Sequence, residues 1–584
     1  MTNTFELQMP ERVIFAETLL RFFDYNQLNN TIRRTENDII RLIDDLMEQI
    51  ELKYDISPED LKNIPSEGPF IIISNNPYKG IDSMLLYKII SEKRNDFKII
   101  ANHLLHDVES LRNVIIPVNT IETTRTRSSY YGIKTAQNHL REGHCLGIFP
   151  AGLESDMNSV SKIVMDHEWQ YSAIKMIRKS GVPVIPVYFH GTRIQSNLKR
   201  IMNPFANPEE LPSELVNRKK RIISVRIGSQ ISVNEQNQFS EISTFGKYLR
   251  SRTYLLGSAF KIKKPVKPVS SKKAEPLVKP VDPVVLNDEV ARIKPECELF
   301  KNNIYSVLCA PVDKIPYVFA EIGRLREETF RNVGEGTNKS TDTDEYDLYY
   351  QHLFIWDNQR SRIVGAYRIG KGKEILYKYG IKGFYINSLF GIDDEFSHVL
   401  ESSLELGRSF IAIDYQKKAL SLFLLWKGIM CFLLKYPEYR YLIGPVSISN
   451  DFSELSKTLI VLFSQKYFKD EMYSALIKPK KEFKIDPCSE EDCQILTTIT
   501  NGSLGRLEKL ILDIEKGCTL PVLLKRYLEI NGKIVGFNID PDFNNCLDGL
   551  LLLDIYKTPA ELIRGLSREL NDPSILKRFD LDTN

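Results

Sequence analysis

The chain has 584 residues, of which 42% are hydrophobic and 26% charged, and its 78 Lys and Arg against 76 Asp and Glu give a formal net charge of +2. These figures are typical of globular proteins and exclude a collagen-like, a disordered or a disulfide-rich secreted chain. A charge so close to balance also speaks against a dedicated nucleic-acid-binding protein, and the length predicts several domains.

The first sixty residues predict two helices, around residues 12–24 and 36–53, that pack outside a sheet. The N-terminal stretch has acidic residues early and no unbroken apolar run. We therefore do not expect a signal peptide.

From residue 70 to residue 227, short apolar runs alternate with amphipathic stretches. The stretches at 131–141 and 170–179 have the apolar spacing of helices. The predicted strands are residues 70–74, 98–101, 114–118, 145–149, 184–189 and 222–227. Strands separated by helices predict an α/β sheet covered on its faces, with the chemistry on loops at the strand ends.

Two of these strand ends carry polar motifs. The first reads SNNPYKGID over residues 74–82, and the second reads FPAG over residues 149–152. In this order and at this spacing they resemble the glycerophosphate and lysophospholipid acyltransferase family, over about residues 60–230. The resemblance implies a catalytic His that is oriented by an Asp, here Asp82. It also implies a loop that helps to hold phosphate, formed by Phe149, Pro150 and Gly152.

Asn76 stands where that family has its His. A carboxamide cannot act as a base near neutral pH, and losing a positioned base costs about 10²–10⁴-fold in rate. Two hypotheses follow: a weakened O-acyltransferase in which another His supplies the base, or a lipid- or membrane-binding pseudo-acyltransferase. The candidate replacements are His103, His106, His139, His144 and His167.

Residues 261–283 form a compositional break, with seven Lys and five Pro. Prolines block helices and central strands, so this stretch predicts an extended linker. It is either a plain tether or a patch that touches anionic phospholipid. The predicted domains are residues 1–257 and 290–584, with the linker at 258–289.

The second half predicts a helix at 318–330, a hairpin of strands 353–356 and 363–367, and a strand at 441–444. The apolar stretch at 417–435 contains Lys427 and predicts a buried helix, since a membrane span needs about 20 apolar residues. Seven residues of this half carry potential chemistry, namely Arg326, Phe330, Asp344, Asp347, Arg368, Glu405 and Arg408.

This ordered set resembles the GNAT-like N-acyltransferases that make ornithine and glycine lipids, over nearly all of residues 296–556. The fold class is therefore expected to be α/β, with a glycerophosphate-acyltransferase-like domain joined by the Lys/Pro-rich linker to a C-terminal GNAT-like domain. The resemblance implies that the C-terminal half joins a 3-hydroxyacyl group to an amino-acid amine, and that the N-terminal half O-acylates the resulting lyso-lipid. No metal or organic cofactor is expected. The implied acyl donor is an acyl carrier protein thioester, with acyl-CoA as the alternative.

Amide formation suggests a role for each residue type. The amine must lose a proton before it attacks a thioester, and we expect the carboxylate of Glu405 to take it, with Asp344 and Asp347 near the ammonium or the carrier. The amino acid's carboxylate needs an Arg fork, supplied by Arg326, Arg368 or Arg408. Two structural alternatives stay open: a helix-surface pair of Glu405 and Arg408, and a helix cap formed by the two aspartates.

An acidic carrier protein favours a basic docking site, for which the linker and residues 478–481 are candidates. The expected partners are the carrier, ornithine or glycine, a lyso-aminolipid and a membrane surface, and no nucleic acid. The expected location is cytoplasmic, peripheral on the inner face of the membrane. A further hypothesis is a non-enzymatic, haemolysin-like protein associated with membranes.

Overall fold

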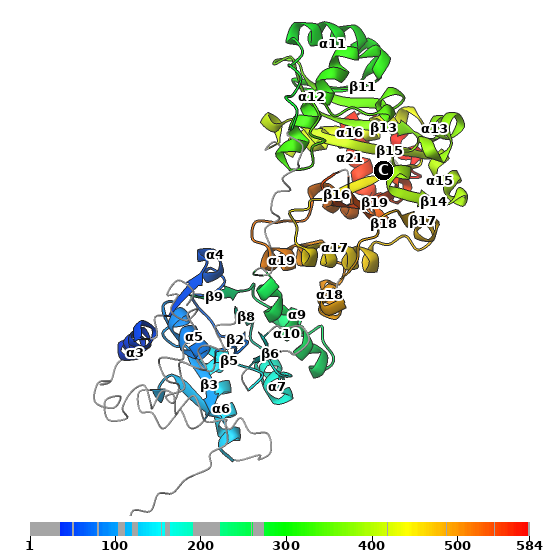
Figure 1. The fold of residues 1–584 in the computed structure, drawn as a ribbon. Helices are drawn as coiled ribbons and strands as arrows, with labels where there is room; N and C mark the ends of the chain where they lie inside the picture. The colour runs from blue at the N-terminus through cyan, green and yellow to red at the C-terminus, as the bar shows by residue number, and fades with distance from the viewer. Residues whose placement is uncertain are drawn as a thin grey trace, which may run out of the picture. The chain divides into compact units, whose positions relative to one another are not determined.

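A computed structural model describes residues 36–49, 52–78, 81–102, 111–118, 127–152, 155–157, 164–190, 222–258, 260, 274–416, 419–485, 487–541, 543–570 and 572–581. The described residues form two compact units, each with its own main sheet (Figure 1). The first unit draws on residues 1–262, 491–501 and 512–516, and the second on 263–490, 502–511 and 517–584. Both units are α/β, as the sequence predicts.

The first unit is built on a seven-stranded sheet in the order β1-β9-β8-β2-β5-β3-β4. Its neighbouring strands are parallel except for β8 and β9. The strands are β1 (Lys53–Ile56), β2 (Phe70–Ser74), β3 (Lys98–Asn102), β4 (Ile115–Val118), β5 (Cys145–Ile148), β8 (Val184–Phe189) and β9 (Ile222–Ile227), with a separate pair of β6 (Asp156–Met157) and β7 (Val164–Met165). The six predicted strands are confirmed.

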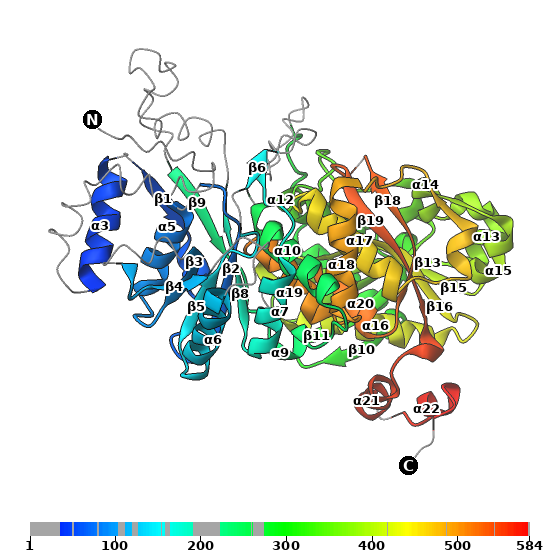
Figure 2. The same ribbon diagram turned by 90° about the horizontal axis from the view of Figure 1, so that it is seen from below.

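Helices cover both faces of this sheet (Figure 2). Phe70 and Ile72 of β2 pack in one core with helix α5, while α10, which also contacts α7, packs against β2 as well. The helices are α3 (Glu36–Gln49), α4 (Pro58–Leu61), α5 (Ile81–Ser91), α6 (Arg127–Arg141), α7 (Tyr171–Ser180), α9 (Val233–Gln236) and α10 (Ile242–Ser258).

Two predictions near the N-terminus have different outcomes. The helix expected at residues 36–53 ends at Gln49, and Lys53 already opens β1, a short edge strand with an alternating burial pattern. The helix expected at 12–24 lies outside the described residues.

The second unit has an eight-stranded sheet in the order β10-β11-β12-β13-β15-β16-β19-β18, in which β15 and β16 are the one parallel pair among its described strands. The strands are β10 (Glu298–Asn302), β11 (Tyr305–Pro311), β12 (Gln351–Asp357), β13 (Arg362–Lys371), β15 (Ser403–Ile411), β16 (Tyr441–Ile448), β18 (Lys533–Asp540) and β19 (Cys546–Asp554), with a separate pair of β14 (Phe390–Ile392) and β17 (Ile477–Pro479). The predicted hairpin and the strand at 441–444 are confirmed.

Opposite faces of this sheet carry different helices. Gly428 of α16 packs against Val307 and Leu353, while the next residues along the same two strands, Leu308 and Phe354, share a core with α11 and α12. The helices of the second unit are α11 (Pro283–Cys297), α12 (Pro316–Asn332), α13 (Gly372–Tyr379), α14 (Ile386–Leu389), α15 (Ser397–Glu401), α16 (Ala419–Lys435), α17 (Glu454–Tyr467), α19 (Leu504–Ile514), α20 (Val522–Glu529), α21 (Ala560–Leu570) and α22 (Ser574–Arg578). Most of α18 (Pro487–Thr500) belongs to the first unit. None of the described helices has both the length and the apolar character needed to cross a membrane.

The predicted linker extends too far toward the C-terminus. Helix α11 begins at Pro283, with Asp282 as its N-cap, so residues from 283 on are helical. The reason is that proline is well tolerated in the first turn of a helix, where its missing N–H has no intrahelical partner to lose. Residues 261–273 lie outside the described residues.

Candidate functional site

A cavity of about 290 Å³ lies where β15 and β16 stop pairing. Their register ends at the pair Glu405–Ile443, and the cavity is lined by Leu442, Ile443 and the residues that follow on both strands, 406–409 and 444–447. The outer edges of the two strands pair with β13 and β19. The edges that face each other therefore offer backbone N–H and C=O groups to an extended, amide-bearing ligand.

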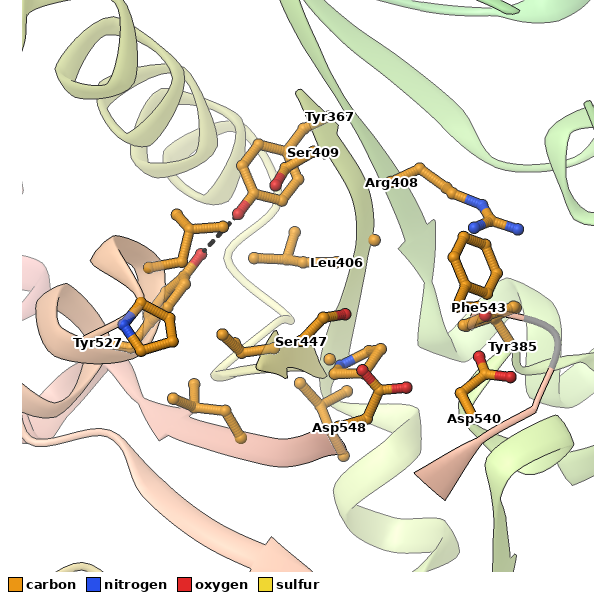
Figure 3. A pocket seen from close by; sticks show the side chains of 18 of the residues that line it. Tyr367, Tyr385, Leu406, Arg408, Ser409, Ser447, Tyr527, Asp540, Phe543 and Asp548 are labelled. Carbon is orange, nitrogen blue, oxygen red and sulfur yellow. Dashed lines mark hydrogen bonds between the residues drawn. The ribbon is translucent and has the colours of Figure 1, made fainter. Parts of the chain in front are cut away.

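The two ends of the cavity differ in chemistry (Figure 3). The side chains of Tyr367, Ser409 and Tyr527 gather at one end, where the hydroxyl oxygens of the two tyrosines are 3.4 Å apart. The other end is charged and aromatic, and Asp548 and Ser447 lie between the two ends. The labelled side chains of the charged end are Arg408, Tyr385, Asp540 and Phe543.

Behind the charged end, the predicted arginines and aspartates meet in one network. The terminal nitrogens of Arg326 are 3.1 and 2.8 Å from the two carboxylate oxygens of Asp347, and Arg368 lies 3.2 Å from the same carboxylate. Asp344 forms ion pairs with Arg368 and, at 3.5 Å, with Arg408. Burial raises the pKa of Asp347, but the two guanidinium groups outweigh burial and hold it well below its usual range.

Asp344 and Asp347 are also a helix cap, as one of the sequence alternatives expects. They form a capping box at a short 3-10 helix, Glu345–Leu348, in which each side chain accepts a backbone N–H of the other. The two readings are compatible, since a carboxylate has lone pairs for both a backbone N–H and an arginine.

Glu405 is buried on β15, just before the segment that lines the cavity. The hydroxyl of Tyr350 and the backbone N–H groups of Tyr385 (3.2 Å) and Ile386 (2.7 Å) donate to its carboxylate. Burial raises the pKa of Glu405 to about 7 in spite of these donors. Glu405 is not among the described residues that line the cavity, and its predicted role as proton acceptor stays a prediction. The alternative of a helix-surface pair with Arg408 is wrong, because both residues lie in a strand.

Of the predicted residues, Arg408 and Phe330 line the cavity. Arg408 has a φ of 52°, at a point where the pairing of β13 with β15 shifts by one residue, and its guanidinium lies 4.3 Å from the ring centre of Phe543. The Phe330 ring meets Phe543 edge to face. Arg326 and Arg368 lie behind them, with Arg368 over the rings of Tyr346, Tyr350 and Tyr385.

Three carboxylates that line the cavity are not among the predicted site residues: Glu335, Asp540 and Asp548. Burial raises the pKa of Glu335 to about 7, and burial together with the charge of Asp540 raises that of Asp548 to about 7. The sequence does carry one signal for Asp548, its position within the apolar run CLDGLLLLD. A charged residue is rarely buried in such a run unless it has a specific role.

A second cavity of about 680 Å³ shares four residues with the first, namely Tyr385, Arg408, Asp540 and Phe543. Three lysines line it: Lys339, Lys480 and Lys481. Two of them belong to the segment 478–481 that the sequence indicates as a docking site.

In the first unit, the two predicted loops lie at the same edge of the sheet, because each follows one of the parallel neighbours β2 and β5. The N–H of Ser155 donates to the carbonyl oxygen of Asn76 at 3.0 Å, and the N–H of Asn76 donates to Asp166 at 3.1 Å. Buried Asp82, in the first turn of α5, accepts the N–H of Tyr78 at 2.8 Å.

The loop at 149–152 follows β5 and needs its glycine. Gly152 has a φ of 65°, and a Cβ there would be 2.2 Å from the side chain of Gln170. Phe149 is partly buried and Pro150 is buried. The backbone geometry of this loop therefore depends on Gly152, and the role of the loop in holding phosphate stays a prediction.

The proposed replacement histidines are not brought to Asn76 within the described residues. The Nε2 of His139 lies 2.9 Å from the carbonyl oxygen of Asp96 and 3.2 Å from that of Cys145, which opens β5 at the opposite edge of the sheet. His144 pairs with Asp96 at the same edge. His139 and His144 therefore cannot replace the missing base; His167 is exposed, and His103 and His106 lie outside the described residues.

The same edge holds the one possible metal-binding group found among the described residues, His139, Glu142 and His144, whose ligand atoms lie within 4.8 Å of one another. Both imidazole rings already make the contacts given above. The expectation of no metal stays a prediction.

Two family models match the chain. One, described as an acyltransferase, covers residues 20–262, and the other, described as an acetyltransferase (GNAT) domain, covers residues 325–427. They assign an acyltransferase domain to the N-terminal part and a GNAT domain to the C-terminal part.

Several characterised proteins are similar to this chain. A glycine N(alpha)-acyltransferase of Bacteroides thetaiotaomicron is 27% identical over 297 residues, which is 48% of this chain and 86% of the relative. A protein of the same name from Phocaeicola vulgatus is 29% identical, over 44% of this chain and 81% of the relative. A lyso-glycine lipid O-acyltransferase of Phocaeicola vulgatus is 25% identical, over 28% of this chain and 57% of the relative. Together with the two domains, these relatives show that the chain is an acyltransferase.

Proposed function

We propose that the second unit of this acyltransferase transfers a fatty acyl group from a thioester to the amine of glycine, forming an amide. The observation that carries the proposal is the cavity between β15 and β16, which joins a hydroxyl-bearing end to an end with both signs of charge. A thioester on an extended amide-bearing arm suits the unpaired strand edges. A glycine zwitterion suits the charged end, since it needs a cation for its carboxylate and anions for its ammonium.

Arg408 is the residue that we assign to the glycine carboxylate. It lines the cavity, and its Nε has no hydrogen-bond partner among the described residues. A guanidinium with free donors binds a carboxylate bidentately. Arg326 and Arg368, the other two candidates, hold the aspartates behind the cavity and position the loop at 342–347.

We assign the donor to an acyl carrier protein, with acyl-CoA as the alternative. The second cavity supports this choice, because Lys339, Lys480 and Lys481 make its rim basic next to the proposed reaction site. An acidic carrier, or the phosphate of its arm, would be attracted there. The product amide belongs in a bilayer, so we place the protein in the cytoplasm, peripheral on the inner face of the membrane.

The direct test incubates the purified full chain with a 3-hydroxyacyl carrier protein and either glycine or ornithine, and identifies the products by mass spectrometry. We expect N-acylglycine. Ornithine is the competing acceptor, because its second ammonium could use one of the extra carboxylates. Arg408→Gln should raise the KM for glycine at least about 10-fold, the loss of one charge-assisted bidentate contact. The matched control is Arg362→Gln, an exposed arginine of β13, and absence of any amide product would overturn the proposal.

A second activity, O-acylation of the resulting lyso-lipid, is the role that we propose for the first unit. Its support is the hydrogen bond from the N–H of Ser155 to the carbonyl oxygen of Asn76, together with the similarity to lyso-glycine lipid O-acyltransferases. Asn76, which stands where the family has its catalytic His, counts against this activity. The alternative is a lipid-binding pseudo-acyltransferase, and in that case only monoacylated product would form. A third hypothesis is a non-enzymatic, haemolysin-like protein. Such a protein would lyse membranes even when a substitution abolishes amide formation.

A further inference from the structure

Resting on the proposed amide formation, we propose that Asp548 is the catalytic base, whose carboxylate takes the proton from the ammonium of the bound amino acid. Asp548 lies on β19, opposite Ser447 of β16 in the antiparallel register. It is only 3% exposed, yet it lines the cavity and lies between its charged and hydroxyl-bearing ends (Figure 3). This is where an amine anchored through its carboxylate on Arg408 meets a thioester entering between the strands.

The contrast with Glu405 favours Asp548. Three donors occupy the carboxylate of Glu405, which is not among the described residues that line the cavity. A base must come within hydrogen-bond reach of the proton that it takes. Asp548 meets this requirement on the cavity wall, and Glu405 instead fixes the backbone at Tyr385 and Ile386.

The charges around Asp548 suit an ammonium ligand. The groups that face it are Asp540 of β18, Glu335 after α12, Cys546 on its own strand and the Ser447 hydroxyl, with Tyr385 and Arg408 on the same cavity. Burial, together with the negative charge of Asp540, makes the carboxylate of Asp548 more basic and raises its pKa to about 7, and the same negative charge attracts the ammonium. A base with a pKa near the working pH transfers protons efficiently.

The step balances as follows. The ammonium gives one proton to the Asp548 carboxylate, and the neutral nitrogen attacks the thioester carbonyl carbon. The C–N bond forms, the C–S bond breaks, and the second proton lost by nitrogen goes to the departing thiolate. Asp548 then releases its proton to solvent.

The test uses the full chain and compares two acceptors that both carry a carboxylate. Glycine needs a base at pH 7, whereas aminooxyacetate has a weakly basic nitrogen that is already neutral. In Asp548→Asn we expect glycine acylation to fall about 10²–10⁴-fold. Aminooxyacetate acylation should stay within about 10-fold of wild type. Asp554→Asn, a buried carboxylate on the same strand paired with Arg440, is the matched control and should keep the rates for both acceptors.

The pH profile supplies a second test that does not depend on the Asn variant. The hydrogen bond from Ser447 lowers the pKa of Asp548, so Ser447→Ala should move the rising limb of the glycine rate to higher pH. Glu405→Gln should leave the rising limb of the glycine rate at the same pH, even where the variant's overall rate differs from that of wild type.

Two results would overturn the assignment: Asp548→Asn acylating glycine with the wild-type rate and pH profile, or losing both acceptors equally. Wild-type protein that forms no amide from glycine would overturn the proposed function itself. The failure of either proposal is therefore recognisable separately.

Discussion

At the scale of single residues, two buried aspartates of the second unit have opposite pKa shifts. Asp347 lies between Arg326 and Arg368, whose positive charges keep it ionised. Asp548 forms no such ion pair with any residue that the structure describes, and burial with a like charge nearby raises its pKa. The first arrangement stabilises a fold, and the second is typical of a residue that exchanges protons.

Asp347→Asn should therefore destabilise the protein strongly. The change leaves two buried guanidinium groups without their shared counter-charge, and breaking such a pair costs about 3–5 kcal/mol of unfolding free energy. Denaturant unfolding of the full chain measures the loss. Exposed Glu345, in the same short helix, is the matched control, and its Gln variant should stay within about 0.5 kcal/mol. Equal, small effects would contradict the reading of Asp347 as structural.

Asp548→Asn should stabilise the protein, and increasingly so as the pH rises. Because folding raises the pKa of Asp548 to about 7, its contribution to stability is full below the ordinary carboxyl pKa and is lost as the pH rises to about 7. The Asn variant cannot ionise and escapes this loss, which is on the order of 4 kcal/mol at most. The apparent Tm of the variant minus that of wild type should be larger at pH 8 than at pH 5. A difference that does not change with pH would contradict the shift.

At the scale of secondary-structure elements, the close approach of β15 and β16 directly after their last pair depends on Gly444. A Cβ there would be 2.1 Å from the carbonyl oxygen of Leu406. Gly444→Ala should lower the unfolding free energy by about 1–3 kcal/mol and reduce amide formation, because the strands must move apart at the cavity. Gly565→Ala in α21, where an added methyl meets nothing within 4 Å, is the control for stability. Equal melting temperatures for both variants would count against this account.

The sequence predicts the elements well where the pattern is local, as in the hairpin of β12 and β13 and the buried helix α16. It also singles out Arg408 and Phe330, because they belong to an ordered set of marks near one another in the chain. The same reasoning gives no site role to the carboxylates Asp540 and Asp548. They come from β18 and β19, more than a hundred residues later, and reach the cavity only through the antiparallel pairing of β16 with β19.

Whether the first unit O-acylates a lyso-glycine lipid depends more on the side chain of Asn76 than on the fold of the unit. The backbone N–H and carbonyl of Asn76 both bond within the protein, so the main chain there is fixed independently of the amide side chain. Sequence alone identifies the missing base. The structure adds that His139 and His144 lie at the wrong edge of the sheet.

At the scale of the whole molecule, Asn76→His should increase diacylated product at least about 10-fold, since it restores a base where the family has one. The gain should stay below the full effect of such a base, because Asp82 already accepts the N–H of Tyr78. Mass spectrometry of mono- and diacylated products from the full chain measures it, with Asn76→Gln as the control without a base. No increase would identify the first unit as a binding unit.

The Lys/Pro-rich stretch and the change of motifs across it predict two α/β units, but not that residues 491–501 and 512–516 belong to the first of them. The end of that stretch cannot be predicted either, because Pro283 and its neighbours have the composition of a linker and the conformation of a helix start. Proline content alone does not distinguish the two.

The unpaired edges of β15 and β16 link acyl-donor binding to the order of the sheet. A donor arm lying between them would supply the hydrogen bonds that the two strands do not give each other beyond Glu405 and Ile443. Among residues 406–409, 444, 446 and 447, the amide hydrogens that face the opposite strand should then exchange with deuterated solvent slowly when a non-hydrolysable donor analogue is bound and quickly without it. At about 100 times its Kd the analogue would add about 2.7 kcal/mol to the folded state. The enzyme would therefore resist heat and proteases best in cells that are well supplied with fatty acyl thioesters.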